Sequence, residues 1–271
     1  MALDHVRDFF HISAMTEDPT NLTTTTPSLF FTRWITHYCA PVFVFLSGTS
    51  AFLSGQKKSK KELSAFLLKR GLFLIVLEIV VINFLIVFDP LYRFIGLQVI
   101  WAIGVSMVLL SFLIYLPIRV LFIVGMVLVV GHNMLDGFNY RNMDDIPLWY
   151  AFLHQQMFTS YGEGRFFAVL YPLIPWPGIM LLGYCMGTWF IKEFDAAKRK
   201  RLLLGWGSAA LMAFFLLRWM NVYGDLVPWT TQKDTTTTIL SFFNVTKYPP
   251  SLLYCCMTLG PALLFLIWLE K

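Results

Sequence analysis

Apolar runs alternate with short polar segments along almost the whole chain. A helix needs about 20 residues to cross the hydrocarbon core of a bilayer, and most of the runs approach that length. Proline, glycine and clusters of charge separate the runs, as expected where helices end. Small residues at 47–51 would let neighbouring helices approach closely. The pattern predicts an all-α, polytopic transmembrane helix bundle of about eight spans, at about 1–10, 29–53, 72–88, 97–116, 120–135, 166–191, 202–223 and 250–269.

The composition is that of an integral membrane protein. Hydrophobic residues make up 57% of the chain and charged residues 14%, and the mean hydropathy is +0.65. In soluble domains about 25% of residues are charged. We interpret residues 1–271 as a single transmembrane domain. The first run is too short to cross a bilayer, so we expect the chain to begin within its first helix.

Basic residues gather in two loops and predict the topology. Residues 56–70 carry six basic residues against one acidic residue, and residues 192–201 carry five against two. Cytoplasmic loops are enriched in Lys and Arg. An even number of predicted spans separates the two loops, so both fit on the cytoplasmic side. The net charge of +5 lies mainly in such loops, which argues against a nucleic-acid partner and for the lipid bilayer.

The stretch from Asp4 to His11 concentrates polar chemistry in an otherwise apolar chain. Asp4, Arg7, Asp8 and His11 are spaced at i, i+3, i+4 and i+7, which places them on one face of a helix. His5 lies about 100° around the helix from Asp4. Charges at membrane depth cost at least ~2.5–3.5 kcal/mol each, so they mark function or pair with one another. Asp4 or Asp8 could orient a histidine that removes a proton, and Arg7 could steady a developing negative charge.

Simpler structural interpretations stand beside this one. Arg7 could form an ion pair with Asp4 or Asp8 at the membrane interface, with both histidines solvated. Arg33 and His37 are one helical turn apart and could share a cavity, although a single buried histidine is often only a hydrogen-bonded core residue. Arg218 is predicted to snorkel towards the membrane surface. His132 and His154 are predicted to lie at the membrane interface.

Several motifs resemble the bacterial branch of the heparan-alpha-glucosaminide N-acetyltransferase catalytic-domain family, which includes a domain of unknown function. More distantly, the chain resembles the acyltransferase-3-like superfamily, in which an Arg is followed after ten residues by a His in helix one. His5 matches that histidine by position, whereas the Arg would fall before Met1. The motifs occupy residues 1–10, 34–48, 98–104, 171–178 and 243–250.

The resemblance implies a membrane-bound acyltransferase of the bacterial inner membrane. The acyl donor would be cytosolic acetyl-CoA or another acyl-CoA, and the acceptor would be an extracytoplasmic sugar or a similar hydroxyl or amine. No metal is implied, and a homo-oligomer remains an open alternative. Family members have about ten or eleven spans, so we expect the chain to lack the start of helix one and its last helices, and to be inactive if it is a fragment.

The resemblance and the residue pattern together nominate site residues. His5 matches the superfamily motif, whereas His11 matches the position used by the lysosomal member, so both remain candidate catalytic histidines. The Gly-rich run that follows helix one in the lysosomal member is missing here. The expected catalytic residues are His5, His11, Asp4 and Asp8, the expected substrate-binding residues are Arg7, Arg33, His37, Trp176 and Lys247, and Lys57, Lys58, Lys60 and Lys61 are expected to attract the phosphates of acyl-CoA.

Two other classes of function fit parts of the pattern. A transporter or exporter would use the same buried charges as a substrate or proton path. Pro172, Pro175 and Pro177 would then break a spanning helix at the transport site. A scaffold without a ligand is disfavoured by the cost of burying Asp4 and Arg7.

Overall fold

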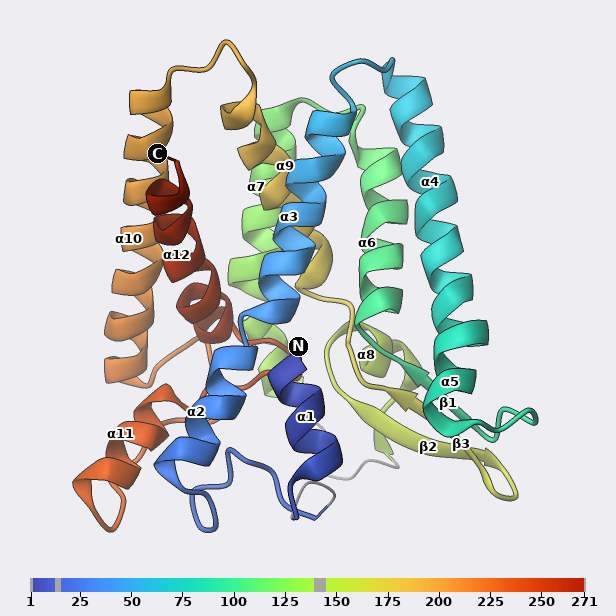
Figure 1. Cartoon of the computed structure of the whole chain (residues 1–271), viewed down its shortest axis with the longest axis vertical. Coiled ribbons are helices and arrows are strands. Elements are labelled where there is room, and N and C mark those ends of the chain that lie inside the picture. Colours follow the sequence, from blue (N-terminus) through green and yellow to red (C-terminus); the bar gives the residue numbers. More distant parts are fainter. Residues whose placement is uncertain (1, 13–15, 139–144, 271) are drawn as a thin grey trace. The chain divides into compact units, whose positions relative to one another are not determined.

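The computed structural model describes residues 2–12, 16–138 and 145–270. The chain is mostly helical (Figure 1). It divides into two compact units. Unit 1 consists of Met1–Val42, Lys200–Lys247 and Ser251–Lys271, and unit 2 consists of Phe43–Arg199 and Tyr248–Pro250. Each unit is described separately.

Unit 1 is built from helices whose starts follow capping rules. The side chain of Thr26 accepts a hydrogen bond from the backbone N–H of Leu29, and a proline occupies the first turn that follows. Asp234 and Ser251 cap two further helices in the same way. The helices of this unit are α1 (Ala2–Phe10), α2 (Pro27–Thr36), most of α10 (Ala196–Met220), α11 (Thr235–Phe243) and α12 (Leu252–Leu269).

Unit 2 contains closely packed helices and a small sheet. A Cβ atom at Gly183 would lie 1.9 Å from the carbonyl oxygen of Phe45, and the Thr49 hydroxyl donates to the Gly183 carbonyl at 2.9 Å. The close approach predicted from the small residues at 47–51 is therefore confirmed. The helices are most of α3 (Cys39–Ser54), α4 (Lys60–Val76), the π-helix η1 (Leu77–Ile82), α5 (Asn83–Val87), α6 (Val99–Leu113), α7 (Ile118–Gly131), the 3₁₀ helices η2 (His132–Phe138) and η4 (Thr188–Phe190), α8 (Leu148–Leu153) and α9 (Trp176–Gly187).

The sheet corrects the prediction of an entirely helical chain. Its strands are β1 (Phe94–Leu97), β2 (Met157–Gly162) and β3 (Arg165–Val169), in the order β1-β3-β2. Strand β3 pairs with β1 in parallel and with β2 in antiparallel orientation. Residues of β3 had been assigned to an apolar span beginning near residue 166. Aromatic and β-branched residues also suit strands, so a short apolar run does not decide between helix and strand.

Five helices among the described residues are long and apolar enough to cross a membrane, and the eight predicted spans are not shown. These candidates are Pro27–Gly55, Lys60–Val87, Ile118–Phe138, Ala196–Met220 and Leu252–Leu269. The predicted span at 97–116 contains α6, which has 15 residues. The predicted span at 166–191 contains α9, which has 12 residues, begins after Pro172 and Pro175 and carries Pro177 in its first turn. The first run forms α1, which has only nine residues.

Candidate functional site

The carboxylate of Asp4 joins α1 to α2 in unit 1. One guanidinium N–H of Arg33 lies 3.0 Å from both carboxylate oxygens, and the hydroxyl of Thr36 donates to the carboxylate at 3.1 Å. Arg7, one turn along α1, forms an ion pair with the same carboxylate. The spacing of Asp4 and Arg7 in the sequence therefore does place them on one helix face. We call Asp4, Arg7, Arg33, Thr36, His37 and Lys247 the Asp4 cluster.

Cations outweigh burial in setting the state of the Asp4 carboxyl. Helix α1 is not among the candidate membrane-spanning segments. Partial burial alone would raise the pKa of Asp4, but Arg33, Arg7 and Lys247 lower that pKa to about 2. The carboxylate is therefore ionised at neutral pH. It holds two guanidiniums in fixed positions, as a charge-assisted hydrogen-bond network does.

His37 continues the cluster one turn beyond Arg33. Its side chain is only 2% exposed, and its Nδ1 has no hydrogen-bond partner among the residues that the structure describes. The hydroxyl of Tyr254 on α12 donates to the His37 carbonyl at 2.7 Å, and the two rings lie 5.3 Å apart. Lys247 and Arg33 both act electrostatically on the His37 ring. A buried imidazole with an unused nitrogen beside cations is a typical acid–base element.

The segment that carries Lys247 is fixed by a buried arginine. Arg218 is 1% exposed and donates hydrogen bonds of 2.6–2.9 Å to four backbone carbonyls, those of Val227, Ser241, Phe242 and Asn244. The nearby carboxylate of Asp225 accepts hydrogen bonds from Thr246 and Ser251, on either side of Lys247. The predicted snorkelling of Arg218 is therefore wrong. Its guanidinium finds partners within unit 1, because an arginine in an apolar helix needs acceptors wherever it lies.

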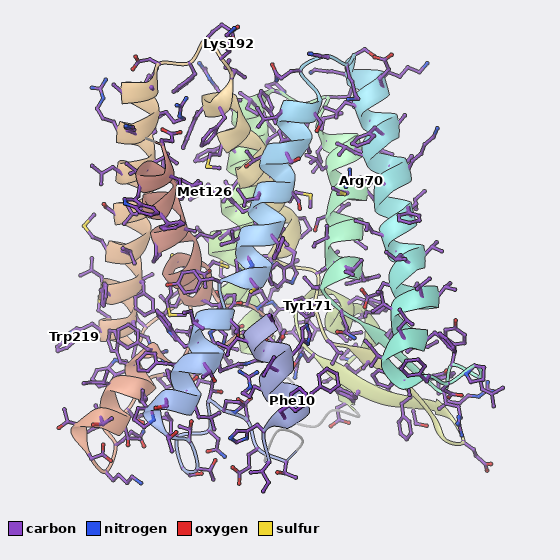
Figure 2. The ribbon with its side chains drawn as sticks, in the orientation of Figure 1. Phe10, Arg70, Met126, Tyr171, Lys192 and Trp219 are labelled. Carbon is purple, nitrogen blue, oxygen red and sulfur yellow. The ribbon has the colours of Figure 1, made fainter. Side chains whose placement is uncertain are left out.

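The histidines of α1 and the loop after it do not share these contacts. His5 and His11 are both exposed, and Phe10 on the same helix is exposed beside them (Figure 2). The hydrogen bonds described for Asp4 go to Arg7, Arg33 and Thr36 rather than to a histidine. The side chain of Asp8 lies outside the described part of the structure. Asp4 therefore orients arginines, and the role of each histidine stays a prediction.

The remaining predicted site residues belong to unit 2. Trp176 opens α9 and is completely buried, and its indole Nε1 has no hydrogen-bond partner among the described residues. The basic residues expected to attract acyl-CoA are exposed around the start of α4: Lys57, Lys58, Lys60 and Lys61. Within the described ranges, no group of three His, Cys, Asp or Glu side chains could hold a metal ion.

Sequence reasoning missed a second group of polar residues, which lies in unit 2. We call it the α8 polar cluster, and it consists of His132, Asn133, Asp136, Tyr150 and His154. His132 and His154, which were predicted to be interfacial, are buried inside the protein. His154 Nε2 lies 2.7 Å from a carboxylate oxygen of Asp136, and the amide of Asn133 donates to the other oxygen at 2.8 Å. The residues come from η2 and from the end of α8. The sequence does place these residues in or next to the polar segment between two predicted spans. Their spacing along the chain, however, does not indicate which of them contact one another.

The comparisons with known proteins give one family. Residues 9–220, well over half of the chain, match the family profile described as "Heparan-alpha-glucosaminide N-acetyltransferase, catalytic". No curated protein and no solved structure matches the chain.

Proposed function

Because this chain belongs to the heparan-alpha-glucosaminide N-acetyltransferase catalytic family, we propose that it is a membrane-bound acyltransferase of the bacterial inner membrane. It moves an acetyl or related acyl group from cytosolic acyl-CoA to a hydroxyl or amine of an extracytoplasmic acceptor, such as a sugar. Family membership supports an acetyltransferase-like activity with acetyl-CoA as donor. The long apolar helices support a multi-pass membrane location.

The Asp4 cluster is the observation that carries this proposal. Acyl transfer builds negative charge on the carbonyl oxygen of the acyl group, and preorganised cations or N–H donors stabilise that charge. Arg7 and Arg33 converge on one carboxylate, which fixes their positions before a substrate arrives. We assign the stabilisation of the oxyanion to these guanidiniums, with Lys247 contributing a further positive charge.

A histidine takes the proton from the attacking hydroxyl or amine. His5 and His11 are the candidates given by the resemblance, and both are accessible at α1 and just after it. His37 is a third candidate, because its unpartnered Nδ1 lies within the Asp4 cluster. In each case the imidazole accepts one proton as the acyl carbon–oxygen or carbon–nitrogen bond forms, and the thiolate of CoA leaves.

Acetyl-CoA binding and transfer by the purified protein test the proposal. Calorimetry should detect binding of acetyl-CoA, and transfer of labelled acetyl should be measured to a panel of amino and hydroxyl acceptors. Single variants His5→Gln, His11→Gln and His37→Gln then separate the three candidate bases. The variant that lacks the true base should transfer acetyl about 10²–10⁴-fold more slowly, while its acetyl-CoA binding persists. Transfer that survives in all three variants would overturn the assignment of a histidine base.

The donor side has its own test. Replacing Lys57, Lys58, Lys60 and Lys61 together with Gln should weaken acetyl-CoA binding, and the difference from the native protein should shrink at high salt. Lys233→Gln, at an exposed lysine in a different loop, is the matched control and should bind normally. A protein that binds no acetyl-CoA but moves a solute in response to a proton gradient would instead be an exporter.

A further inference from the structure

Glu78 is a buried carboxyl group that the proposed acyl transfer does not use. It lies in the candidate membrane-spanning segment Lys60–Val87 and is 1% exposed. Neither of its carboxyl oxygens has a hydrogen-bond partner among the described residues. Ionisable side chains inside membrane-spanning segments are costly and usually serve a function. Packing alone therefore does not explain this residue.

Asp225 shows how the same protein satisfies a buried carboxylate. Its side chain is 2% exposed, and the guanidinium of Arg218 lies 3.9 Å away. Its oxygens accept hydrogen bonds from the backbone N–H and the hydroxyl of Thr246 and from the hydroxyl of Ser251. Buried polar groups normally find partners in this way. Among the residues that the structure describes, Glu78 departs from that rule with both oxygens.

Close helix packing directs Glu78 towards the start of α6. Helix α4 continues through the π-helix η1 into α5 and lies beside α6 (Figure 1). A Cβ atom at Gly71 would lie 2.6 Å from the carbonyl oxygen of Gly104, so the backbones of α4 and α6 are in contact. Glu78 follows Gly71 by seven residues, about two helical turns, and therefore lies on the same side of its helix. This side faces α6, which agrees with the burial of Glu78.

The first backbone N–H groups of α6 act on the Glu78 carboxyl. Those of Gln98, Ile100 and Trp101 favour its ionised form, although none makes a hydrogen bond of normal geometry with either oxygen. The first N–H groups of a helix have no partners within the helix, and the side chain of Gln98 does not cap them. They also carry the positive end of the helix dipole. An ionised Glu78 would therefore complement the start of α6.

No other charge competes at this position. The π-helix η1 packs against α4, α5, β1 and α6, and Glu78 is the only titratable residue in η1, α5, β1 and α6. Arg70, which is labelled in Figure 2, is the charged residue of α4 nearest to it in the chain, eight residues earlier. None of the charged residues of α4 is among the groups that act on the Glu78 carboxyl, and they are Lys60, Lys61, Glu62, Lys69 and Arg70. Burial, which favours the neutral form, is therefore opposed only by the N–H groups of α6.

Asn83 fixes the backbone that carries Glu78. Its amide N–H groups donate to the Glu78 carbonyl at 2.8 Å and to the Gly96 carbonyl at 3.1 Å, and its oxygen accepts from the Gly96 N–H at 2.7 Å. These bonds connect η1 to β1, which leads directly to Gln98 and α6. Short π-helical turns occur frequently at functional sites. Glu78 is thus held in a fixed frame against the N–H groups that respond to its charge.

We propose that Glu78 is a proton-binding site inside unit 2. The neutral carboxyl suits a buried position without hydrogen-bond donors of good geometry. When the O–H bond breaks and the proton leaves, the carboxylate becomes the acceptor for the N–H groups at the start of α6. A proton is the whole ligand, so the site needs no cavity. The inference does not depend on the chemistry assigned to the Asp4 cluster.

Infrared difference spectroscopy across pH tests the site in the whole protein. A protonated carboxyl has a carbonyl stretching band that a carboxylate lacks, and ¹³C labelling of glutamate separates its bands from those of aspartate. Exposed glutamates are largely ionised above about pH 5, whereas buried ones can keep their proton to about pH 9. The native protein should lose one glutamate band between these values. The band should be missing from Glu78→Gln and retained in Glu163→Gln, the control at an exposed glutamate. The proposal is overturned if no glutamate band titrates in this range, or if the band persists in Glu78→Gln.

The backbone amide of Trp101 gives a second, local readout. Its ¹⁵N-tryptophan NMR signal should shift with the same midpoint as the infrared band, because a negative charge forms beside its N–H. The signal of Trp206, on α10 in unit 1, should not follow that midpoint. Glu78→Asp keeps a carboxyl and should still titrate with a changed midpoint, which also provides a test if Glu78→Gln does not fold. A Trp101 signal that ignores the midpoint of the band would overturn the proposal. Neither experiment involves acetyl-CoA, so failure of the proposed acyl transfer remains distinguishable.

Discussion

The Asp4 cluster and the α8 polar cluster both centre on one carboxylate, but they neutralise it differently. Asp4 is shared between the guanidiniums of Arg7 and Arg33, so charge attraction holds α1 to α2. Asp136 is bound by the imidazole of His154, which joins η2 to the end of α8, and by the amide of Asn133 within η2 itself. Buried charges are costly to leave unpaired, whereas neutral hydrogen bonds are lost more cheaply.

This difference suggests different uses for the two clusters. Fixed cations that face a reaction can stabilise charge as it develops, which suits the chemistry of group transfer. An imidazole held by a carboxylate has a fixed ring orientation, which suits a structural or recognition role. The predictions below test whether charge distinguishes the two clusters, and they run from the largest expected effect to the smallest.

Removing the Asp4 charge should have the largest effect. Asp4→Asn leaves Arg7 and Arg33, with side chains 6% and 17% exposed, facing each other without their shared carboxylate. Losing one partner of a buried ion pair costs about 3–5 kcal/mol, and partial exposure places this loss at the lower end. Thermal unfolding in detergent should show a clear drop in midpoint. Asp234→Asn should be nearly neutral, because asparagine also caps a helix well. Equal stability of the two variants would contradict a charge-held cluster.

Acid should weaken the Asp4 cluster over a defined range of pH. The pKa of Asp4 in the folded protein is about 2, below the usual value of 3.8 for an aspartate side chain. A lowered pKa means that the stabilisation is fully present above about pH 4 and is lost as the pH falls towards 2, a change on the order of 2 kcal/mol. Comparing the unfolding free energy of the native protein and of Asp4→Asn across this range isolates the contribution. If the unfolding free energies of the two proteins ran parallel across this pH range, the neighbouring cations would not lower the pKa of Asp4.

The α8 polar cluster should lose less stability than the Asp4 cluster when its carboxylate is replaced, because an imidazole and an amide bind Asp136 instead of two guanidiniums. Asp136→Asn keeps the oxygen that contacts His154 Nε2 but replaces the other oxygen with an NH₂ group. That group then faces the NH₂ donor of Asn133, so one donor loses its acceptor. One unsatisfied buried group should cost roughly 1–2 kcal/mol. The unfolding midpoint should therefore fall by less than in Asp4→Asn. A larger fall would mean that the α8 polar cluster is also held mainly by charge.

The sequence predicted the Asp4 cluster better than the α8 polar cluster because helical spacing is a local signal. The i, i+3 relation of Asp4 and Arg7 can be read without knowing the fold, and so can the i, i+4 relation of Arg33 and His37. Asp136 and His154 are 18 residues apart and meet only because η2 and α8 pack together. Thr36, Tyr254 and Arg218 were missed as site-forming residues for the same reason, since their partners lie far along the chain.

The fold was predicted where apolar runs are long and uninterrupted. The candidate spans at 27–55, 118–138 and 252–269 closely match predicted runs, whereas those at 60–87 and 196–220 begin earlier, inside segments that were predicted to be basic loops. The prediction failed between residues 166 and 175, where most of β3 and a segment with two prolines replace the start of a predicted helix. Period and hydropathy do not distinguish a short buried strand from a helix, and tertiary pairing between β1 and β3 decides the outcome.

The smallest test removes one hydroxyl from the Asp4 cluster. Thr36 donates to Asp4 and also contacts the Arg33 carbonyl at 2.7 Å. Thr36→Val keeps the shape of the side chain but removes this hydroxyl, and it should cost about 1 kcal/mol of stability while the ion pairs persist. Thr32→Val on the same helix is the matched control, because the hydroxyl of Thr32 bonds only to the Leu29 carbonyl of its own helix. If Thr36→Val destabilised the protein as much as Asp4→Asn, the hydroxyl rather than the ion pairs would hold α1 to α2, and the contrast between a cluster held by guanidiniums and one held by an imidazole and an amide would fail.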